Sequence, residues 1–439
     1  MTRNKCGSLF ISTIAAVLIA VAGAAAATIG TNPPVEPLTR ERIAQLPRNE
    51  RRAWLDYLAR SQRRCQADKD FLQAELKRVG IEKPTEPPHG FSARSIPLNH
   101  EPAWYASAEA LRIADVILSF QTPAGGWGKN LDMSKQPRRP GEAFTPNNLS
   151  KFLSPGDFDT PLEPDWNYVG TIDNDATTTQ LNFLAKVIVA SQAENATAYR
   201  AAFLHGMDYL FAAQYPNGGW PQVWPLEGGY HDAITYNDDA MTQVVDLMGK
   251  AAEGRDEFSF VPNDVRTRAA ASFALGIKCI LATQIIVNGT PTVWPQQDDA
   301  LTLKPVSGRN YEPPAQCASE SASLLSMLMN SLPRPTVAEQ RSIRAAAAWL
   351  KKTAIYGQSW QRTPEGRELV PAPGAGPVWA RYYQLGTDIP IFADRDKSIH
   401  DKVNEISAER RNGYSWYSAD SQRALDRFEK WSAEFPERK

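Results

Sequence analysis

The chain has 439 residues, of which 42% are hydrophobic and 22% charged, and its formal net charge is -1. This composition is that of a globular protein long enough to bury one large core or two modest ones. The balance of 48 basic and 49 acidic residues leaves no overall field that would favour binding to DNA, RNA or an anionic membrane. Recognition of a charged ligand therefore has to depend on local groups.

The first 27 residues have the pattern of a secretory signal peptide. Arg3 and Lys5 precede an apolar run that ends near Val21, and small residues follow it. The run is short for a membrane span, so we expect cleavage near Ala26 or Ala27 and no membrane attachment afterwards. The expected location is secreted or periplasmic. The mature chain keeps three cysteines without CxxC spacing, which gives no support to zinc or redox chemistry.

Residues 28–90 are predicted to form a linker followed by a charged helical segment. The linker, up to about residue 40, is rich in Pro and Thr. From there to residue 80, apolar residues recur at helical spacing among many charged ones. The run 83–90 contains three prolines and ends in a glycine, so we place the boundary of a catalytic domain, residues 91–439, after it.

From about residue 103 the chain repeats a unit of helix, glycine-rich loop, polar stretch and second helix. Gln121 and Gln214 begin two such loops, which lead through Gly-Gly to Trp127 and Trp220, and a looser copy begins at Gln284. Helical hairpins repeated in this way stack so that each buries the apolar face of its neighbour. Period-two alternation is rare, so strands are weakly indicated. We therefore predict an all-α fold, an α/α toroid (short α/α barrel) of helical hairpins.

Two long loops, residues 121–170 and 214–235, are rich in Trp, Asn, Asp, Lys and Tyr. Loops longer than about 12 to 15 residues in a compact domain usually carry function, so we expect these irregular loops to form a polar cleft. Trp127 and Trp220 fit two roles here. Each could plug the end of a helix pair or stack on a sugar ring in the cleft, and the sequence leaves both open.

Two related runs place oxygen-bearing side chains immediately before apolar stretches. The first contains Asp173 and Asn174, and the second contains Asp238 and Asp239. Aligned on their shared Asp-Ala, the runs put Asp238 opposite Asn174. Helix capping would use only one such side chain per run. Asp173, Asn174 and Asp238 are therefore candidate ligands of Ca²⁺, which prefers carboxylate and carbonyl oxygens. Two well-capped helices are the alternative.

Sites built on histidine find little support. Of the five histidines, only His231 falls on a predicted cleft loop, so neither a histidine triad nor a histidine-rich metal site is indicated. Three arginines stand out instead: Arg309 lies near Glu312 in a proline-stiffened stretch, and Arg381 and Arg395 lie in aromatic or turn-like settings. Arginine forks match carboxylates. Together with a cation site, they indicate a repeated acidic ligand.

Five motifs resemble those of family 10 polysaccharide lyases, which are pectate lyases. They are Gly-Gly-Trp-Gly-Lys-Asn at 125–130, Thr-Ile-Asp-Asn-Asp-Ala-Thr at 171–177, Tyr-Asn-Asp-Asp-Ala-Met at 236–241, Gly-Arg-Asn-Tyr-Glu-Pro at 308–313, and the stretch from Tyr382 to Asp396. The resemblance covers roughly residues 100 to 420. The order and spacing of five motifs make it more specific than any single motif would be.

The resemblance implies a secreted pectate lyase that cleaves polygalacturonate by Ca²⁺-assisted β-elimination and gives 4,5-unsaturated oligogalacturonides. Carried over by motif, Asp173, Asn174 and Asp238 would lie on the Ca²⁺ side, and Arg309 would be the Brønsted base. The substrate-binding candidates are Arg381, Arg395, Lys304, Lys129, Trp127, Trp220 and Tyr311. In one place the sequence departs from the family: Gln297 stands where the family often has histidine.

The chemistry is reasonable in its own terms, with one difficult step. Cationic groups that bind the C6 carboxylate would stabilise the negative charge that develops when the C5 proton is removed. A guanidinium, however, keeps its proton to a pH above about 12. Nearby positive charges, such as Lys304, would lower the pKa of Arg309, and an alkaline pH optimum would follow.

Two other functions stay open from the sequence. A metal-independent glycoside hydrolase on an α/α scaffold would use Asp173 and Asp238 as acid and base, about 6.5 to 9.5 Å apart. A non-catalytic protein that binds an acidic polysaccharide would use the tryptophans as stacking platforms. For the lyase, the expected partner is polygalacturonate, no nucleic acid is involved, and the expected state is a monomer.

Overall fold

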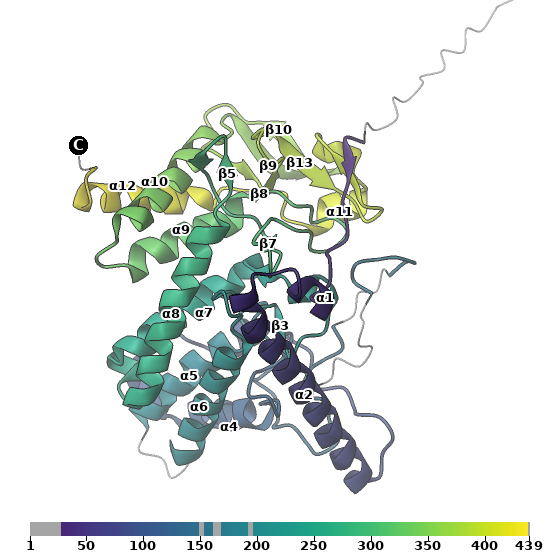
Figure 1. The fold of residues 1–439 in the computed structure, drawn as a ribbon, viewed down its shortest axis with the longest axis vertical. Helices are drawn as coiled ribbons and strands as arrows, with labels where there is room; N and C mark the ends of the chain where they lie inside the picture. Colours follow the sequence, from purple (N-terminus) through teal and green to yellow (C-terminus); the bar gives the residue numbers. More distant parts are fainter. Residues whose placement is uncertain (1–27, 149–152, 161–167, 192–195, 438–439) are drawn as a thin grey trace, which may run out of the picture.

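The computed structural model of the chain describes residues 28–148, 153–160, 168–191 and 196–437, so the predicted signal peptide lies outside the described residues (Figure 1). The helices are α1 Arg40–Ile43, α2 Arg48–Val79, α3 Ser92–Ser95, α4 Ala108–Ser119, α5 Thr178–Ala190, α6 Ala196–Ala213, α7 Ala240–Glu253, α8 Asn263–Thr283, α9 Ala318–Ser331, α10 Val337–Lys352, α11 Ala408–Gly413 and α12 Ser421–Glu434. Short 3₁₀ turns span Pro102–Ala106, Gly229–Asp232, Asn237–Asp239, Asp256–Phe258 and Val403–Glu405.

The strands are short and pair antiparallel. Their bounds are β1 Gly30–Thr31, β2 Gly170–Thr171, β3 Val223–Trp224, β4 Ile234–Thr235, β5 Ile286–Val287, β6 Thr290–Pro291, β7 Gln297–Asp298, β8 Gln316–Cys317, β9 Gln358–Thr363, β10 Gly366–Pro371, β11 Trp379–Ala380, β12 Tyr382–Tyr383, β13 Pro390–Ala393, β14 Ser398–His400 and β15 Tyr417–Ser418. Five of them form one sheet in the order β1-β14-β13-β12-β8. The hairpin β9–β10 and four other strand pairs stand apart from it.

The prediction of an all-α toroid is wrong. About 47% of the chain is helical, but 12% is strand in several small antiparallel sheets, and a closed ring of helical hairpins is not what the structure shows. The strands escape a search for alternation because most of them are two residues long, too short to show a period of two. Their pairing joins distant segments, as when β8 meets β12, so local propensity carries little information about them.

The helices nevertheless pack as the repeated unit indicates. α5 lies against α6, α7 against α8, and α9 against both α10 and α12. Each of the three repeated loops is fixed by its first residue, a glutamine whose amide donates to one carbonyl of its own loop and one of a later helix. The pairs of carbonyls are those of Gly125 and Ala202 for Gln121, Gly218 and Ser272 for Gln214, and Thr292 and Ser342 for Gln284.

The tryptophans of the three repeated loops are buried against helices and do not line a cleft. Trp127, Trp220 and Trp294 are fully buried. Each indole N–H donates to a carbonyl of the preceding helix, at distances of 2.7, 2.8 and 2.7 Å. The stacking role predicted for Trp127 and Trp220 is therefore wrong, because neither ring has a face open to a sugar. A glycine-rich loop brings the ring back onto its own helix, and a sequence pattern alone does not separate the two roles.

The N-terminal segment joins the C-terminal sheet. β1 pairs with β14, with Gly30 opposite Ile399 and Thr31 opposite Ser398. Figure 1 shows this purple strand at the edge of the yellow-green C-terminal sheet, after which the chain runs through α1 into the long helix α2. α2 packs on the body through buried side chains that include Trp54. Strand pairing thus ties the first described residues to the last quarter of the chain.

Other sequence expectations concern the cysteines and the membrane. In the part of the chain that the structure describes, Cys279 and Cys317 are buried and form no disulfide. Among the described residues, no helix combines the length and the apolar character that a membrane crossing requires.

Gln214→Ala should destabilise the fold by about 1–3 kcal/mol, because two carbonyls lose their donor and the hydroxyl of Ser272, which donates to Gln214 at 2.8 Å, loses its acceptor. The free energy of unfolding in urea measures this. Gln62→Ala on the exposed face of α2 is the control, with an expected change below about 0.5 kcal/mol. Equal effects of the two changes would show that the glutamine does not hold its loop.

Candidate active site

At two helix starts, polar residues adopt a left-handed backbone conformation. Before α5, Asn174 has a φ of 52° and Thr177 a φ of 64°; before α7, Asp238 has a φ of 48° and Asp239 a φ of 61°. Asn and Asp tolerate this left-handed conformation better than other non-glycine residues. Neither N-cap residue, Thr177 or Asp239, makes a side-chain cap hydrogen bond. The alternative of two well-capped helices is therefore wrong.

Asp173 is a buried carboxylate held in its charged form. It is 2% exposed, and the Lys129 ammonium lies 2.5 Å from its Oδ2. Asn237 donates to its Oδ1 at 3.4 Å. Burial alone would raise the pKa of Asp173, but the attraction of Lys129 and, more weakly, of Arg309 lowers it below the ordinary value. The structure thus brings together Lys129, a predicted substrate-binding residue, and Asp173, a predicted metal ligand.

Asp238 is the second carboxylate of the site. Burial and the negative charge of Asp173 raise the pKa of Asp238 to about 6, while 43% of its side chain stays exposed. Asn237 donates to its Oδ2 at 2.9 Å, and Arg381 lies 4.0 Å from its Oδ1. The mutual influence of Asp173 and Asp238 means that their charges are close, so the structure brings the two helix starts together as the alignment of the runs predicts.

Asp239 belongs to a different surface. Burial raises the pKa of Asp239 to about 6, and its carboxylate interacts with Ser323 of α9. It also lines a hollow of about 840 Å³ between α7, α9 and α12, together with Lys250, Asn330 and Arg427. From the sequence, the choice of Asp238 over Asp239 rested only on the alignment of Asp238 with Asn174. The structure places Asp238 beside Asp173 and turns Asp239 towards this hollow.

The donors around Asp173 fit a hard cation in part. Among the described residues, no group of three or more His, Cys, Asp or Glu side chains is arranged to hold a metal ion. Two neighbouring carboxylates repel each other, as the raised pKa of Asp238 records, and a divalent cation would relieve that repulsion. Asn174 is half-buried at the same helix start and offers an amide oxygen. Because Ca²⁺ takes six to eight oxygens, the remaining ligands would come from water or a bound anion.

Arg381 faces Asp238 from the C-terminal sheet. Its guanidinium forms an ion pair with Glu320 of α9 and donates to Asn237 at 3.2 Å. It also lies over the Tyr414 ring, 4.7 Å from the centroid. Glu320 and the other attractive partners raise the pKa of Arg381 well above its ordinary value against the effect of burial, so the group stays charged. One fixed cation therefore faces one carboxylate across the site.

Arg309 is paired inside its own turn. Its Nη2 lies 2.5 Å from Glu312 Oε1, and its backbone N–H donates to Glu312 Oε2 at 2.7 Å. Burial would lower the pKa of Arg309, but Glu312 raises it well above the ordinary value. In return, Arg309 outweighs the effect of burial and lowers the pKa of Glu312 to about 2. The pair holds Arg309 protonated in this state.

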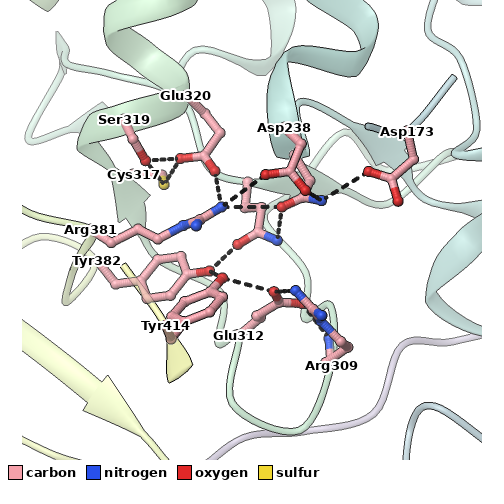
Figure 2. A network of polar contacts seen from close by, with 12 residues as sticks. Asp173, Asp238, Arg309, Glu312, Cys317, Ser319, Glu320, Arg381, Tyr382 and Tyr414 are labelled. Atoms are coloured by element: carbon pink, nitrogen blue, oxygen red, sulfur yellow. Dashed lines mark hydrogen bonds and ion pairs between the residues drawn. The ribbon is translucent and has the colours of Figure 1, made fainter. Parts of the chain in front are cut away.

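A chain of polar contacts connects the carboxylates to Arg309, as Figure 2 shows. Gln296 donates to Asn237 at 2.7 Å and accepts from Tyr382, whose hydroxyl lies 2.7 Å from that of Tyr414. Tyr414 donates to Glu312 at 2.8 Å. Asn237, Tyr414 and Glu320 were not among the site residues predicted from the sequence. Asn237 could have been predicted, because it directly precedes Asp238 in the second Asp-rich run. No sequence pattern indicated Tyr414 as a site residue.

Arg395 lies over the ring of Tyr311, which Arg309 also contacts. The guanidinium carbons of Arg309, Arg395 and Arg410 lie 4.9, 5.4 and 4.3 Å from the centroid of Tyr311. Arg395 also pairs with Glu409 at 2.8 Å. Tyr311 is 3% exposed, so it gathers arginines and offers little surface to a substrate. The expected substrate contact of Tyr311 is therefore wrong, and Arg410 is a member of the cluster that sequence reasoning missed.

Three further residues take other positions. Lys304 is exposed and lines a separate hollow with Ile285 and Leu385, away from the network. Gln297 is buried and donates to the Tyr230 carbonyl at 3.0 Å, so it has a structural partner where histidine was expected. Burial and the nearby Lys129 lower the pKa of His231 to about 3, which keeps the ring neutral. These positions agree with a site of oxygens and arginines.

Comparisons with known proteins identify relatives of this arrangement. A family model described as pectic acid lyase matches residues 121–425. The solved structure of a family 10 polysaccharide lyase from Cellvibrio cellulosa is 30% identical, with a TM-score of 0.64, and the match covers 78% of this chain and 99% of that one. A mutant of that lyase in complex with trigalacturonic acid has the same identity and TM-score over 77% and 98% of the two chains. No curated protein matches the chain.

The Glu312 pair predicts how acid affects stability. The pKa of Glu312 falls from 4.5 to about 2 on folding, so the unfolded chain binds more protons between these values. The free energy of unfolding should therefore rise with pH from about 2 to 4.5, by roughly 3 kcal/mol from this group. Glu312→Gln should remove that part of the rise in urea unfolding between pH 3 and 5. Glu36→Gln, at an exposed position, should not, and equal slopes in both variants would contradict the account.

Proposed function

Because the chain belongs to the pectic acid lyase family and is a pectate lyase, we propose that it cleaves polygalacturonate at the network of Figure 2 by β-elimination. One observation carries this proposal: two carboxylates, Asp173 and Asp238, and two arginines, Arg309 and Arg381, belong to one connected set of contacts. The relative in complex with trigalacturonic acid supports an acidic oligosaccharide as the ligand. The alternatives of a hydrolase and of a non-catalytic binding protein are set aside, because the family is one of lyases.

We propose that Arg381 and Arg395 bind carboxylates of the substrate. The Arg381 side chain is 11% exposed and that of Arg395 24%, so each stays partly accessible while a glutamate fixes its position. A fixed guanidinium binds a carboxylate with little loss of side-chain entropy. Lys129 is 20% exposed and adds positive charge beside Asp173. Together they would stabilise the negative charge that spreads over the C6 carboxylate when the C5 proton leaves.

We propose that Asp173, Asn174 and Asp238 hold Ca²⁺. When bound, the ion would supply positive charge that stabilises the developing enolate. Support comes from the repulsion between the two carboxylates and from the exposed part of Asp238, which is open to water and substrate oxygens. The ion pair of Lys129 with Asp173 competes with the metal for that carboxylate, so Ca²⁺ binding and the position of Lys129 are linked.

We propose Arg309 as the base that takes the C5 proton. Its pairing with Glu312 opposes this role, because it favours the protonated guanidinium. Positive charge from a cation and from Arg381 would work against Glu312 and lower the pKa of Arg309. Tyr414 would weaken the effect of Glu312 on the pKa of Arg309, because its hydroxyl donates to the same Glu312 oxygen that pairs with Arg309. Removal of the proton and loss of the C4 oxygen would leave the unsaturated sugar.

We further propose the organisation of the whole chain. Residues 1–27 would be a signal peptide, residues 28–90 an N-terminal segment and residues 91–439 the catalytic domain. The mature protein would be secreted or periplasmic and monomeric.

Arg309→Ala should lower the kcat of polygalacturonate cleavage by about 10²- to 10⁴-fold, the usual contribution of a general base, with a smaller change in KM. The ultraviolet absorbance of unsaturated products measures the rate. Arg362→Ala, an exposed arginine of β9, is the control and should change kcat less than twofold. If Arg309→Lys keeps most of the activity while substrate binding weakens, Arg309 is an anchor and not the base.

Removal of metal with EDTA should abolish activity, and added Ca²⁺ should restore it. Asp238→Asn should raise the Ca²⁺ concentration for half-maximal activity at least roughly tenfold, because the cation loses a charged ligand. Asp239→Asn is the matched control, since Asp239 interacts with Ser323 and lines the other hollow. An equal Ca²⁺ requirement in the two variants, or full activity in EDTA, would contradict this cation site.

A further inference from the structure

The turn that carries Arg309 is closed by its own hydrogen bonds. Gly308 N–H donates to the Glu312 carbonyl at 2.9 Å, and Glu312 N–H donates to the Arg309 carbonyl at 2.8 Å. A side chain at Gly308 would place its Cβ 2.5 Å from Glu312 Oε2 and 2.6 Å from Gln297 Oε1, so the turn has no room for one. These bonds fix the shape of the turn. They do not fix its position relative to Asp173 and Asp238.

Asn32, near the start of the described chain, fixes the position of the Arg309 turn through hydrogen bonds to its backbone. It is 1% exposed, and its Nδ2 donates to the Arg309 carbonyl at 3.1 Å and to the Asn310 carbonyl at 2.9 Å. Its Oδ1 accepts from the Ser307 hydroxyl at 2.6 Å. One amide therefore holds three residues of the Arg309 turn, and it uses both of its N–H groups to do so.

The backbone of Asn32 is itself fixed to the C-terminal sheet. Its N–H donates to the Lys397 carbonyl at 2.8 Å, directly after the pairing of β1 with β14. Ten residues later, Arg42 pairs with Asp299 at 2.7 Å, upstream of the same turn. The N-terminal segment thus contacts the stretch from Asp299 to Asn310 twice, through Asn32 and through Arg42.

Asn310 connects the same turn to the segment that carries Arg395. It is 2% exposed; its Nδ2 donates to the Arg395 carbonyl at 2.6 Å, and its Oδ1 accepts from Phe158 N–H at 2.9 Å. The carbonyl of Asn310 accepts from Asn32. Asn32 and Asn310 therefore connect four separate segments of the chain, two of which carry Arg309 and Arg395.

We propose that Asn32, which directly follows β1, is a positioning residue for Arg309, although it lies outside residues 121–425, the range that the family model matches. The inference rests on the proposed role of Arg309. Asn32 touches the backbone of the turn and not the guanidinium, so it acts through the position of the whole turn. A displacement of about 1 Å at such a site lowers the rate about 10²-fold.

Asn32→Ala and Asn32→Asp test this proposal. The aspartate keeps the size and the Ser307 contact but presents oxygen to two carbonyls, which removes both donated bonds. Thr31→Ala, at an exposed neighbouring position of β1, is the matched control. We expect kcat on polygalacturonate to fall about 10- to 100-fold in both Asn32 variants, with KM and the Kd for trigalacturonate changed less than about threefold. Thr31→Ala should match the wild type.

A double variant separates positioning from general destabilisation. All rates are measured below the melting temperature of each variant, and near-ultraviolet circular dichroism reports the folded fraction. In an Arg309→Ala background, Asn32→Ala should lower the residual kcat less than about threefold, because the group that it positions is absent. A variant that only loosens the fold would lower both backgrounds equally.

Three results are informative. If folded Asn32→Asp and Asn32→Ala have the kcat of Thr31→Ala, the proposal is overturned while the role of Arg309 stands. If the Asn32 effect has the same size with and without Arg309, Asn32 does not act through Arg309, and the proposal is again overturned. If Arg309→Ala alone keeps full kcat, the proposed function of Arg309 fails, whatever Asn32 does.

Discussion

The ion pair between Arg309 and Glu312 is the interaction on which the site depends. Glu312 is 2% exposed, and a buried carboxylate is tolerated only when charged or strongly polar partners surround it. Its two oxygens receive the Arg309 guanidinium, the Arg309 backbone N–H and the Tyr414 hydroxyl. One carboxylate therefore sets the shape of the turn, the direction of Arg309 and the contact with the aromatic residues of the C-terminal region.

The other side of the site repeats this arrangement. Glu320 of α9 holds Arg381 as Glu312 holds Arg309, and Tyr414 lies under both guanidiniums. The carboxylates Asp173 and Asp238 then face fixed positive groups, with Asn237 between them. Asp238 has a left-handed backbone, and the N-cap residues of the two helices, Thr177 and Asp239, make no side-chain cap hydrogen bond. Fixed charges of both signs in a partly dry site are the electrostatic preorganisation that an elimination reaction requires.

The sequence predicted the chemistry of the site better than its architecture. The repeated Gln and Trp signals are local, so the helical hairpins could be found. The match of two Asp-rich runs put Asp238 opposite Asn174, and in the structure Asp238 lies close to Asp173. The same patterns could not say that Trp127 and Trp220 turn inwards, because burial depends on the helix behind them. Two-residue strands carry no periodic signal. Glu320 and Tyr414 meet Arg381 and Glu312 across 61 and 102 residues, and Asn32 meets Asn310 across 278, so only folding brings them together.

A crystal structure of the Arg309→Ala chain with trigalacturonate and Ca²⁺ tests the central claim most directly. The account predicts a galacturonate carboxylate within hydrogen-bond distance of Arg381 and a cation between it and the carboxylates of Asp173 and Asp238. A trisaccharide bound in the hollow between α7, α9 and α12, with no contact to Arg381 or Asp238, would contradict it.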